Sequence, residues 1–182
     1  ADNDGICDDE DECISIDNCN NCEGQELEYV ELWGECYNIE ETVEIELQGY
    51  DVGSPNNFEQ IPPEIGQLIN LRMFRCASCF IEGPIPSEIG NLNNLEDLQI
   101  SNWITGAVES EIPPEIGNLT NLTSLTLSTL NLSGSIPSNF ENLANLYSLI
   151  LTHNQLSGEI PSYICNIESP VLGDNQFCPP YP

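Results

Sequence analysis

The sequence predicts an α/β solenoid of five stacked coils. Each coil is expected to give one short strand to a parallel sheet and to return through a 3₁₀-like turn or loop. The main observation is a recurring segment, first seen as IPPEIGQLINL, whose copies begin at Ile61, Ile85, Ile112, Ile136 and Ile160. Their spacings are 24, 27, 24 and 24 residues. A near-constant period of this length indicates stacked repeats, because a single coil cannot bury its own leucines.

The pattern within one coil predicts its elements in order. Leu125 and Leu127 alternate with polar residues, which predicts a short strand with one buried face. A glycine then marks a turn, and the following Ile-Pro pair favours extended backbone. The segment Pro-x-x-Ile-Gly-x-Leu is expected to return the chain. Within residues 42–169 we place the coils at 42–70, 71–94, 95–121, 122–145 and 146–169.

These repeats resemble the plant-type leucine-rich repeat, with the pattern LxxLxLxxNxLxGxIPxxLGNLxx. That repeat is found in receptor-kinase ectodomains and polygalacturonase inhibitors, and similar repeats occur in secreted microbial proteins. The resemblance covers residues 27–178 and implies a leucine-rich repeat fold with disulfide-bearing caps. Trp33-Gly-Glu-Cys36 resembles the N-terminal cap, placed at 27–41, and the segment 172–178 resembles the C-terminal cap, placed at 170–182.

One feature of that family is nearly missing from the pattern. Its asparagine ladder, whose side chains bond to backbone groups of the turns, falls on one position per coil. Here that position holds Tyr50, Cys79, Trp103, Leu130 and Asn154. Only Asn154 fits, so we expect apolar packing to replace most of the ladder.

Charge and composition exclude several functions. The chain of 182 residues has 2 Lys+Arg against 31 Asp+Glu, for a net charge of −29. It cannot form the basic surface that nucleic acids or anionic membranes require, and no apolar run is long enough to be inserted into a membrane. Nine cysteines indicate an oxidising compartment, so we expect a secreted protein. One histidine and no lysine leave few acid–base groups, which favours a non-catalytic role.

The cysteines suggest where the caps are closed. Cys165 and Cys178 flank the last turn, where a disulfide would seal the end of the solenoid. The resemblance to the N-terminal cap implies that Cys36 pairs with Cys19 or Cys22. Cys76 and Cys79 have CxxC spacing, which is compatible with a redox or zinc pair, but two buried thiols at apolar positions are favoured. An odd number of cysteines leaves one thiol free or bonded to another chain.

The N-terminal segment 1–26, an acidic and cysteine-rich head, contains a candidate calcium site. Residues 1–46 carry 17 of the acids. Asp2, Asp4, Asp8 and Asp11, with Gly5, have the alternating oxygens and the sharp turn that a calcium loop needs. The segment is similar to thrombospondin type 3 and dockerin repeats, which implies calcium as a cofactor. The alternative is a solvated acidic tail.

Stacking the coils also predicts which residues share the exposed face of the sheet. One row is Glu46, Arg75, Gln99, Thr126 and Ile150, and the next is Glu44, Met73, Asp97, Ser124 and Ser148. Neighbouring strands lie about 4.8 Å apart, so Arg75 is expected to meet Glu46, and Arg72 to meet Glu96. These charges either relieve repulsion on an acidic sheet or form a recognition site. The candidate site residues on this concave face are Arg72, Arg75, Asp97, Gln99 and Tyr147.

Two functions remain open. The first is calcium-stabilised extracellular self-assembly into a filament, surface or matrix component, favoured by the odd cysteine and the acidic head. The alternative is a recognition module that binds a protein or a glycan on its concave face. Partners are therefore expected to be the chain itself, another extracellular protein or a glycan. Because the exposed charged and aromatic residues are scattered, we favour assembly slightly.

Overall fold

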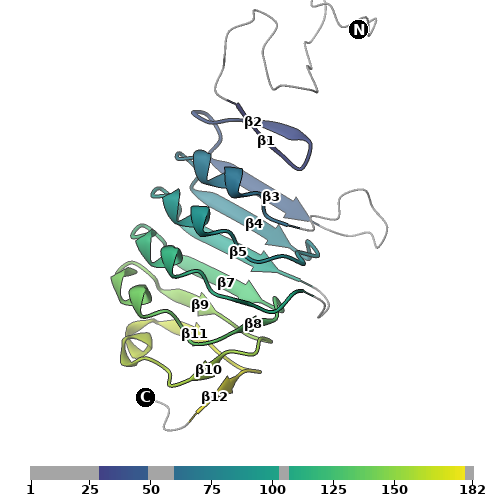
Figure 1. Cartoon of the computed structure of the whole chain (residues 1–182). Helices are drawn as coiled ribbons and strands as arrows, with labels where there is room; N and C mark the ends of the chain where they lie inside the picture. Colours follow the sequence, from purple (N-terminus) through teal and green to yellow (C-terminus); the bar gives the residue numbers. More distant parts are fainter. Residues whose placement is uncertain (1–28, 49–59, 103–106, 179–182) are drawn as a thin grey trace, which may run out of the picture.

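The computed structural model describes residues 29–48, 60–102 and 107–178, which form a solenoid of stacked coils. Their main sheet is parallel and six-stranded, in the order β11-β9-β7-β5-β4-β3. Its strands are β3 (Glu44–Gln48), β4 (Met73–Ala77), β5 (Asp97–Ser101), β7 (Ser124–Ser128), β9 (Ser148–Ile150) and β11 (Ser169–Val171). Figure 1 shows the strands stacked in sequence order, with β3 and β11 at opposite ends of the stack. The predicted solenoid is confirmed.

Five 3₁₀ turns in the described residues form a second column beside the sheet (Figure 1). They are η1 (Pro63–Gln67), η2 (Ser87–Asn91), η3 (Pro114–Asn118), η4 (Ser138–Asn142) and η5 (Ser162–Asn166). Each begins directly after a proline in extended conformation, since proline cannot donate a backbone hydrogen bond but fits the start of a helical turn. The proline of each repeat therefore sets the start of its turn.

The core is made of leucine and isoleucine columns between these two layers. In each of β4, β5 and β7 the second and fourth residues are buried and the others are partly exposed. Leu98, Leu125 and Leu149 share one register row and are all 0% exposed. Since strand side chains alternate between faces, the inward rows bury the apolar residues, while the outward rows are partly exposed among the described residues.

Glycines allow three neighbouring turns to pack closely. A Cβ added to Gly90 would lie 2.6 Å from both Cβ and the backbone oxygen of Glu115 in the next coil. The same is true of Gly66 against Glu88, and of Gly117 against Asn139, with nearest distances of 2.6 and 2.5 Å. Side chains do not tolerate such distances, so glycine is required by packing at these three positions.

Smaller elements close the two ends. At the N-terminal end, β1 (Tyr29–Leu32) and β2 (Glu35–Asn38) form an antiparallel hairpin. Its two-residue turn has φ of 54° at Trp33 and 80° at Gly34, as in a type I′ turn. The Trp33 ring stacks on Phe74 at 6.2 Å, and its Nε1 donates to the Gln60 carbonyl at 2.8 Å. These two contacts hold an unusual backbone conformation for a non-glycine residue.

At the C-terminal end, β11 adds a sixth strand across the predicted boundary between the fifth coil and the cap. The remaining short parallel pairs are β6 (Ser110–Glu111) with β8 (Leu132–Ser133), and β10 (Ser157–Gly158) with β12 (Gln176–Phe177). Cys165 and Cys178 are both free and exposed, so the disulfide predicted between them is absent. Backbone pairing of β11 and β12 with the coil before them closes this end instead.

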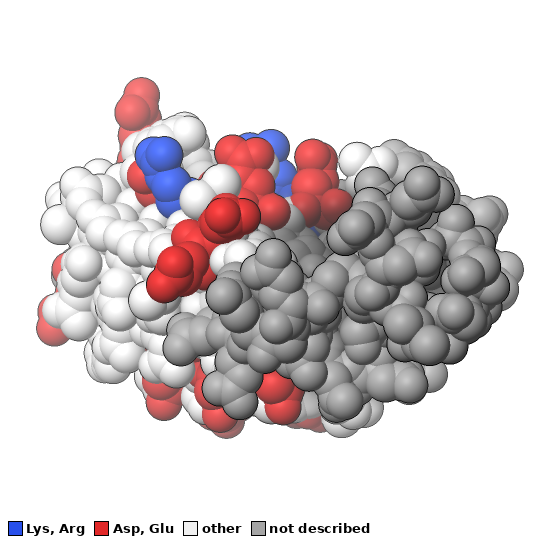
Figure 2. Space-filling view, turned by 90° about the horizontal axis from the view of Figure 1, so that it is seen from above, with Lys and Arg blue, Asp and Glu red and all other residues white. Residues whose placement is uncertain are grey.

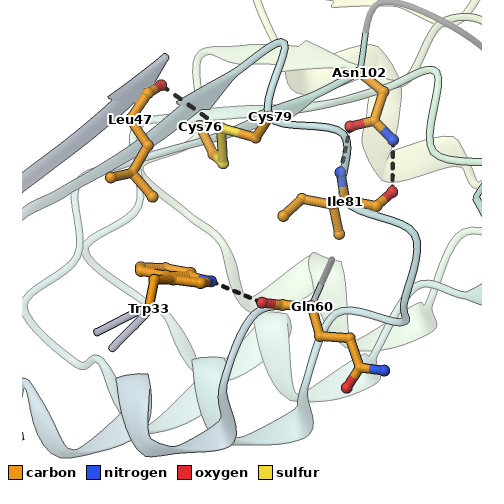
Figure 3. The surroundings of a disulfide bond; sticks show 7 residues. All are labelled: Trp33, Leu47, Gln60, Cys76, Cys79, Ile81 and Asn102. Atoms are coloured by element: carbon orange, nitrogen blue, oxygen red, sulfur yellow. Dashed lines mark hydrogen bonds between the residues drawn. A yellow bond between two sulfur atoms is a disulfide. The ribbon is translucent and has the colours of Figure 1, made fainter. Parts of the chain in front are cut away.

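The prediction of two separate buried thiols is wrong for Cys76 and Cys79. Both residues are 0% exposed, but they form a disulfide, shown in Figure 3. The turn after β4 makes this possible, because Ser78 has a φ of 58° and the two Cα atoms lie 5.5 Å apart. The Sγ of Cys79 lies 3.6 Å from the Leu47 carbonyl oxygen of the preceding coil. Cys36 is also disulfide-bonded, whereas Cys19 and Cys22 lie outside the described residues.

The asparagine ladder is more complete than the sequence suggested. Asn154 accepts from the backbone N–H of Leu130 and Leu132, and it donates to the Leu127 and Leu151 carbonyls. Asn175 makes equivalent bonds one coil later, within the cap. Asn102, one residue before the expected position, bonds to both backbone groups of Ile81 (Figure 3). The prediction failed here because a neighbouring asparagine and the cap supply the side chains.

A second ladder was not predicted. The asparagine three residues before each of β4, β5, β7 and β9 donates its Nδ2 to a backbone carbonyl of the preceding coil or cap. The pairs are Asn70 with Glu40, Asn94 with Ile69, Asn121 with Asn93, and Asn145 with Thr120, at 2.8–2.9 Å. The recurring Asn-Leu pair in the repeat was the signal that could have revealed this ladder.

Candidate functional site

The candidate site is the sheet face, by which we mean the outward side chains of β3, β4, β5, β7, β9 and β11. Its register confirms the predicted rows and extends them to β11. One row is Glu46, Arg75, Gln99, Thr126, Ile150 and Val171, and the next is Glu44, Met73, Asp97, Ser124, Ser148 and Ser169. All these side chains are at least partly exposed. Within the described ranges, no other strand or turn covers this face.

The two arginines pair with acids of the third coil. Arg72 donates from Nε and Nη2 to Oε1 of Glu96, at 3.0 and 2.7 Å, which confirms that predicted pair. Arg75 donates from the same two atoms to Oδ2 of Asp97, at 3.0 and 2.5 Å. Arg75 was expected to pair with Glu46, so that prediction is wrong. Figure 2 shows both arginines, in blue, among red carboxylates along one side of the molecule.

Arg75 pairs with Asp97 rather than with Glu46, because one carboxylate oxygen of Asp97 accepts hydrogen bonds from both Nε and Nη2 of Arg75. The Asp97 side chain is 22% exposed and so shields the pair better than the exposed Glu46 would. Hydrogen bonding and attraction to Asp97, with smaller contributions from Glu46 and Glu44, raise the pKa of Arg75 above its usual value. Arg75 therefore lies in a field of three carboxylates and is charged at every physiological pH.

The sheet face has two different parts. Its charged part comprises β3, β4 and β5 with the adjoining Arg72 and Glu96. Its neutral part comprises β7, β9 and β11, whose outward residues are hydroxyl-bearing or apolar. In the neutral part Ser128 and Thr152 share a hydrogen bond of 3.2 Å. Tyr147 is 54% exposed beside β9, and Val171 is 47% exposed on β11.

The predicted site residues are brought together only in part. Arg72, Arg75, Asp97 and Gln99 lie on or beside two adjacent strands, but Tyr147 lies beside β9, two strands beyond β5. Sequence reasoning missed Val171, because it placed that residue in a cap rather than on a strand. Apolar residues at 150 and 171 in one register row were the missing signal.

The predicted calcium ligands Asp2, Asp4, Asp8 and Asp11 lie outside the described residues. Within the described part, no group of three or more His, Cys, Asp or Glu residues is arranged to hold a metal ion. His153 Nε2 lies 3.1 Å from Oδ2 of Asp174 at the C-terminal end, but both side chains are largely exposed.

Comparison with known proteins agrees with this geometry. Residues 121–143 and 145–167 match the Leucine Rich Repeat family model. The chain has a leucine-rich repeat fold. Among solved structures, this leucine-rich repeat chain is similar to the ectodomain of the Arabidopsis thaliana receptor kinase GASSHO1/SCHENGEN3 in complex with CASPARIAN STRIP INTEGRITY FACTOR 2, with 32% identity and a TM-score of 0.66. The match covers 77% of this chain and 16% of that one.

Two further Arabidopsis structures are also similar. The ectodomain of the receptor kinase HAESA, in complex with an IDA peptide hormone ligand, matches with 33% identity and a TM-score of 0.60. The match covers 74% of this chain and 22% of that one. The BIR3–SERK2 complex matches with 29% identity and a TM-score of 0.63, covering 76% and 71%. The chain therefore spans about a fifth of the length of the GASSHO1/SCHENGEN3 and HAESA structures.

No curated protein sequence gives a significant match to the chain. In the described part of the chain, no helix has the length and apolar character needed to cross a membrane.

Proposed function

We propose that this chain is a secreted, non-catalytic binding module that holds a protein partner against its sheet face. The observation that carries the proposal is the open face itself. Six strands in continuous register present two rows of partly exposed side chains, and nothing among the described residues packs on them. Such a rigid surface, with an apolar part and paired charges, suits recognition of another polypeptide.

The comparisons support this choice of partner. HAESA and GASSHO1/SCHENGEN3 are each in complex with a named ligand, for HAESA a peptide hormone, and BIR3 is in complex with SERK2. These are statements about those proteins. For this chain they favour a polypeptide over a glycan.

The test is differential capture from the extracellular medium of the source organism. The full chain, its Thr126→Arg variant and its Asn118→Arg variant are each immobilised, and retained proteins are quantified by mass spectrometry. Thr126 lies in the middle of the sheet face, whereas Asn118 is exposed on η3 across the core. We expect a partner that wild type and Asn118→Arg retain equally and that Thr126→Arg loses. Equal retention by all three proteins would contradict the proposal.

Calcium-stabilised self-assembly is the second candidate, and its specific observation is the pair of exposed thiols at Cys165 and Cys178. These could join chains, while calcium would act through Asp2, Asp4, Asp8 and Asp11. Self-assembly by head-to-tail stacking of solenoid ends is not favoured at the C-terminal end. Pro170 lacks the N–H that another strand would need, and Cys165 occupies the turn position that holds glycine in η1, η2 and η3.

Electron microscopy of the native protein in calcium and in EDTA, beside a non-reducing gel, tests this candidate. Filaments or ladders that depend on calcium or on disulfides would support it. Dispersed monomers in both conditions would exclude it and leave the sheet face as the working surface.

A further inference from the structure

We infer that the partner presents an extended segment with a cationic side chain at one end and an apolar side chain at the other, lying across the strands from β3 to β11. This inference rests on the proposed function, because it assigns the chemistry of the partner to the same sheet face. Three observations support it. One part of the face is charged and the other is neutral, both arginines pair with acids away from β3, and one register row connects the two parts.

The β3 end of the face carries two carboxylates, Glu44 and Glu46, that form no ion pair with either arginine of the chain. Glu44 and Glu46 are both exposed, and they point to the same side because they are two residues apart on one strand. Arg72 and Arg75 are both turned toward Glu96 and Asp97, on the side away from β3. In the described chain, therefore, no arginine pairs with Glu44 or Glu46.

A cationic group from outside fits this end by charge complementarity. The chain has no lysine and only two arginines against 31 acids, so no further lysine or arginine can pair with Glu44 or Glu46. A net charge of −29 also attracts a basic segment from a distance and raises its association rate. Contact with Glu44 and Glu46 then fixes which end of the segment binds at β3.

The opposite end of the face is apolar. Ile150 and Val171 are register partners on β9 and β11, and Val171 is 47% exposed. Tyr147 precedes β9, is 54% exposed, and accepts a hydrogen bond from Ser169 of β11 through its carbonyl. Since aromatic and aliphatic groups of this kind anchor interfaces, an apolar side chain of the partner is expected here.

One register row connects the two ends and fixes the length of the segment. It runs from Glu46 through Arg75, Gln99, Thr126 and Ile150 to Val171, which is five steps between strands. At about 4.8 Å per step the row spans about 24 Å. An extended chain covers this with about seven residues, at about 3.3 Å each. The middle of the row is uncharged or internally paired, so small polar residues are expected opposite it.

The test uses a fluorescein-labelled octapeptide with two arginines at one end, a Gly-Ser spacer of four residues, and Leu-Phe at the other end. A second peptide has the reverse order, because the direction of the partner is open. Binding is measured by fluorescence anisotropy at 0.15 M salt, to the full chain and to Glu44→Gln/Glu46→Gln and Tyr147→Ser/Val171→Ser variants. The matched control is Glu64→Gln/Glu88→Gln, which removes two exposed carboxylates from the η column.

We expect at least a fivefold weaker Kd for each sheet-face variant and a change of less than twofold for the control. Replacing the Leu-Phe end by Ala-Ala should abolish the effect of Tyr147→Ser/Val171→Ser only. Equal weakening by the control would mean general charge attraction and would overturn the inference, as would unchanged binding in both sheet-face variants. Circular dichroism confirms that every variant is folded.

The outcome is distinguishable from failure of the proposed function. If the capture experiment finds a partner that Thr126→Arg loses, but that partner contacts the face without a basic and an apolar end, the proposed function stands and this inference is wrong. If no partner depends on Thr126, the proposed function itself is wrong.

Discussion

From η1 to η4 the 3₁₀ turns pack closely through glycines, whereas beyond η4 this packing is absent and Asn154 and Asn175 each make several bonds to backbone groups. The close packing of η1 on η2, η2 on η3 and η3 on η4 depends on Gly66, Gly90 and Gly117. The equivalent residue of η4 is Glu141, and no comparably close packing joins η4 to η5. There Asn154 and Asn175 each bond to backbone groups of two coils.

The comparison teaches that one repeat backbone can be stabilised in two ways. The first depends on the absence of a side chain, so almost any substitution is unfavourable. The second depends on one polar side chain satisfying several buried backbone groups. Each part of the chain should therefore lose stability when its own feature, the turn glycine or the bonded asparagine, is removed.

The largest effect is expected at Asn154 in the C-terminal part. Asn154→Ala removes the acceptor for the backbone N–H of Leu130 and Leu132 and the donor to two carbonyls. Buried groups left without partners cost about 1–3 kcal/mol each, so we expect a loss of about 3 kcal/mol in the free energy of unfolding. Urea denaturation measures it. Asn70→Ala, which loses one exposed bond, is the control and should change stability by less than about 1 kcal/mol.

Gly90→Ala should follow, with a loss of about 2 kcal/mol from overpacking against Glu115. Glu141→Ala is the matched control at the same position of the repeat, where no glycine is needed. It should change the free energy of unfolding by less than about 0.5 kcal/mol. Similar losses in both variants, measured by urea denaturation, would show that glycine packing does not distinguish the two parts.

The disulfide position allows an asparagine like Asn154 to be introduced into the N-terminal part. The Sγ atom of Cys79 lies 3.6 Å from the Leu47 carbonyl oxygen. In a later coil, Asn154 donates from Nδ2 to the Leu127 carbonyl in the same way. We expect Cys76→Ala/Cys79→Asn to be about 1 kcal/mol more stable than Cys76→Ala/Cys79→Ala, because the new amide can donate to Leu47. Thermal denaturation of the two variants decides this. Equal stability would mean that an asparagine at position 79 does not reproduce the bonding of Asn154.

Tyr163 provides a pH-dependent test in the C-terminal part. Burial, and then the nearby Glu141, raise its pKa to about 12, and its hydroxyl donates to the Pro137 carbonyl at 2.7 Å. The unfolded chain loses this proton near pH 10 and the folded chain only near pH 12. The stabilisation is therefore fully present below pH 10 and is lost as the pH rises from 10 to 12.

In Tyr163→Phe that part of the pH dependence should disappear, and stability at pH 7 should fall by about 1 kcal/mol with the lost hydrogen bond. Urea denaturation at pH 8, 10 and 11.5 measures both changes. Tyr37 has a pKa of about 12 from burial and Glu35, so Tyr37→Phe should remove a second contribution of the same sign. An unchanged pH dependence in both variants would contradict this account.

The smallest effect is expected from the exposed ion pair of the N-terminal part. Arg72 and Glu96 have side chains that are 60% and 45% exposed, so solvent and salt screen their attraction. Arg72→Gln should reduce the free energy of unfolding by less than about 1 kcal/mol, and by less still at 1 M salt. A loss above 2 kcal/mol would give this pair a structural role that its exposure does not suggest.

The sequence by itself determined the solenoid, the strand register and the rows of the sheet face. It could do so because repeat period and leucine spacing are local properties that every coil satisfies in the same way. The composition also determined the large negative charge. The calcium ligands remain a prediction from sequence alone.

Only the tertiary structure decided which groups meet. Arg75 pairs with Asp97 rather than Glu46, and Cys76 bonds to Cys79, because these choices depend on side-chain reach and on one turn with positive φ. The free Cys165 and Cys178 and the strand β11 are likewise decided at the chain end, where the repeat pattern no longer constrains the backbone. Pairing is a property of three-dimensional distance, and a repeat pattern fixes distances only where every coil follows it.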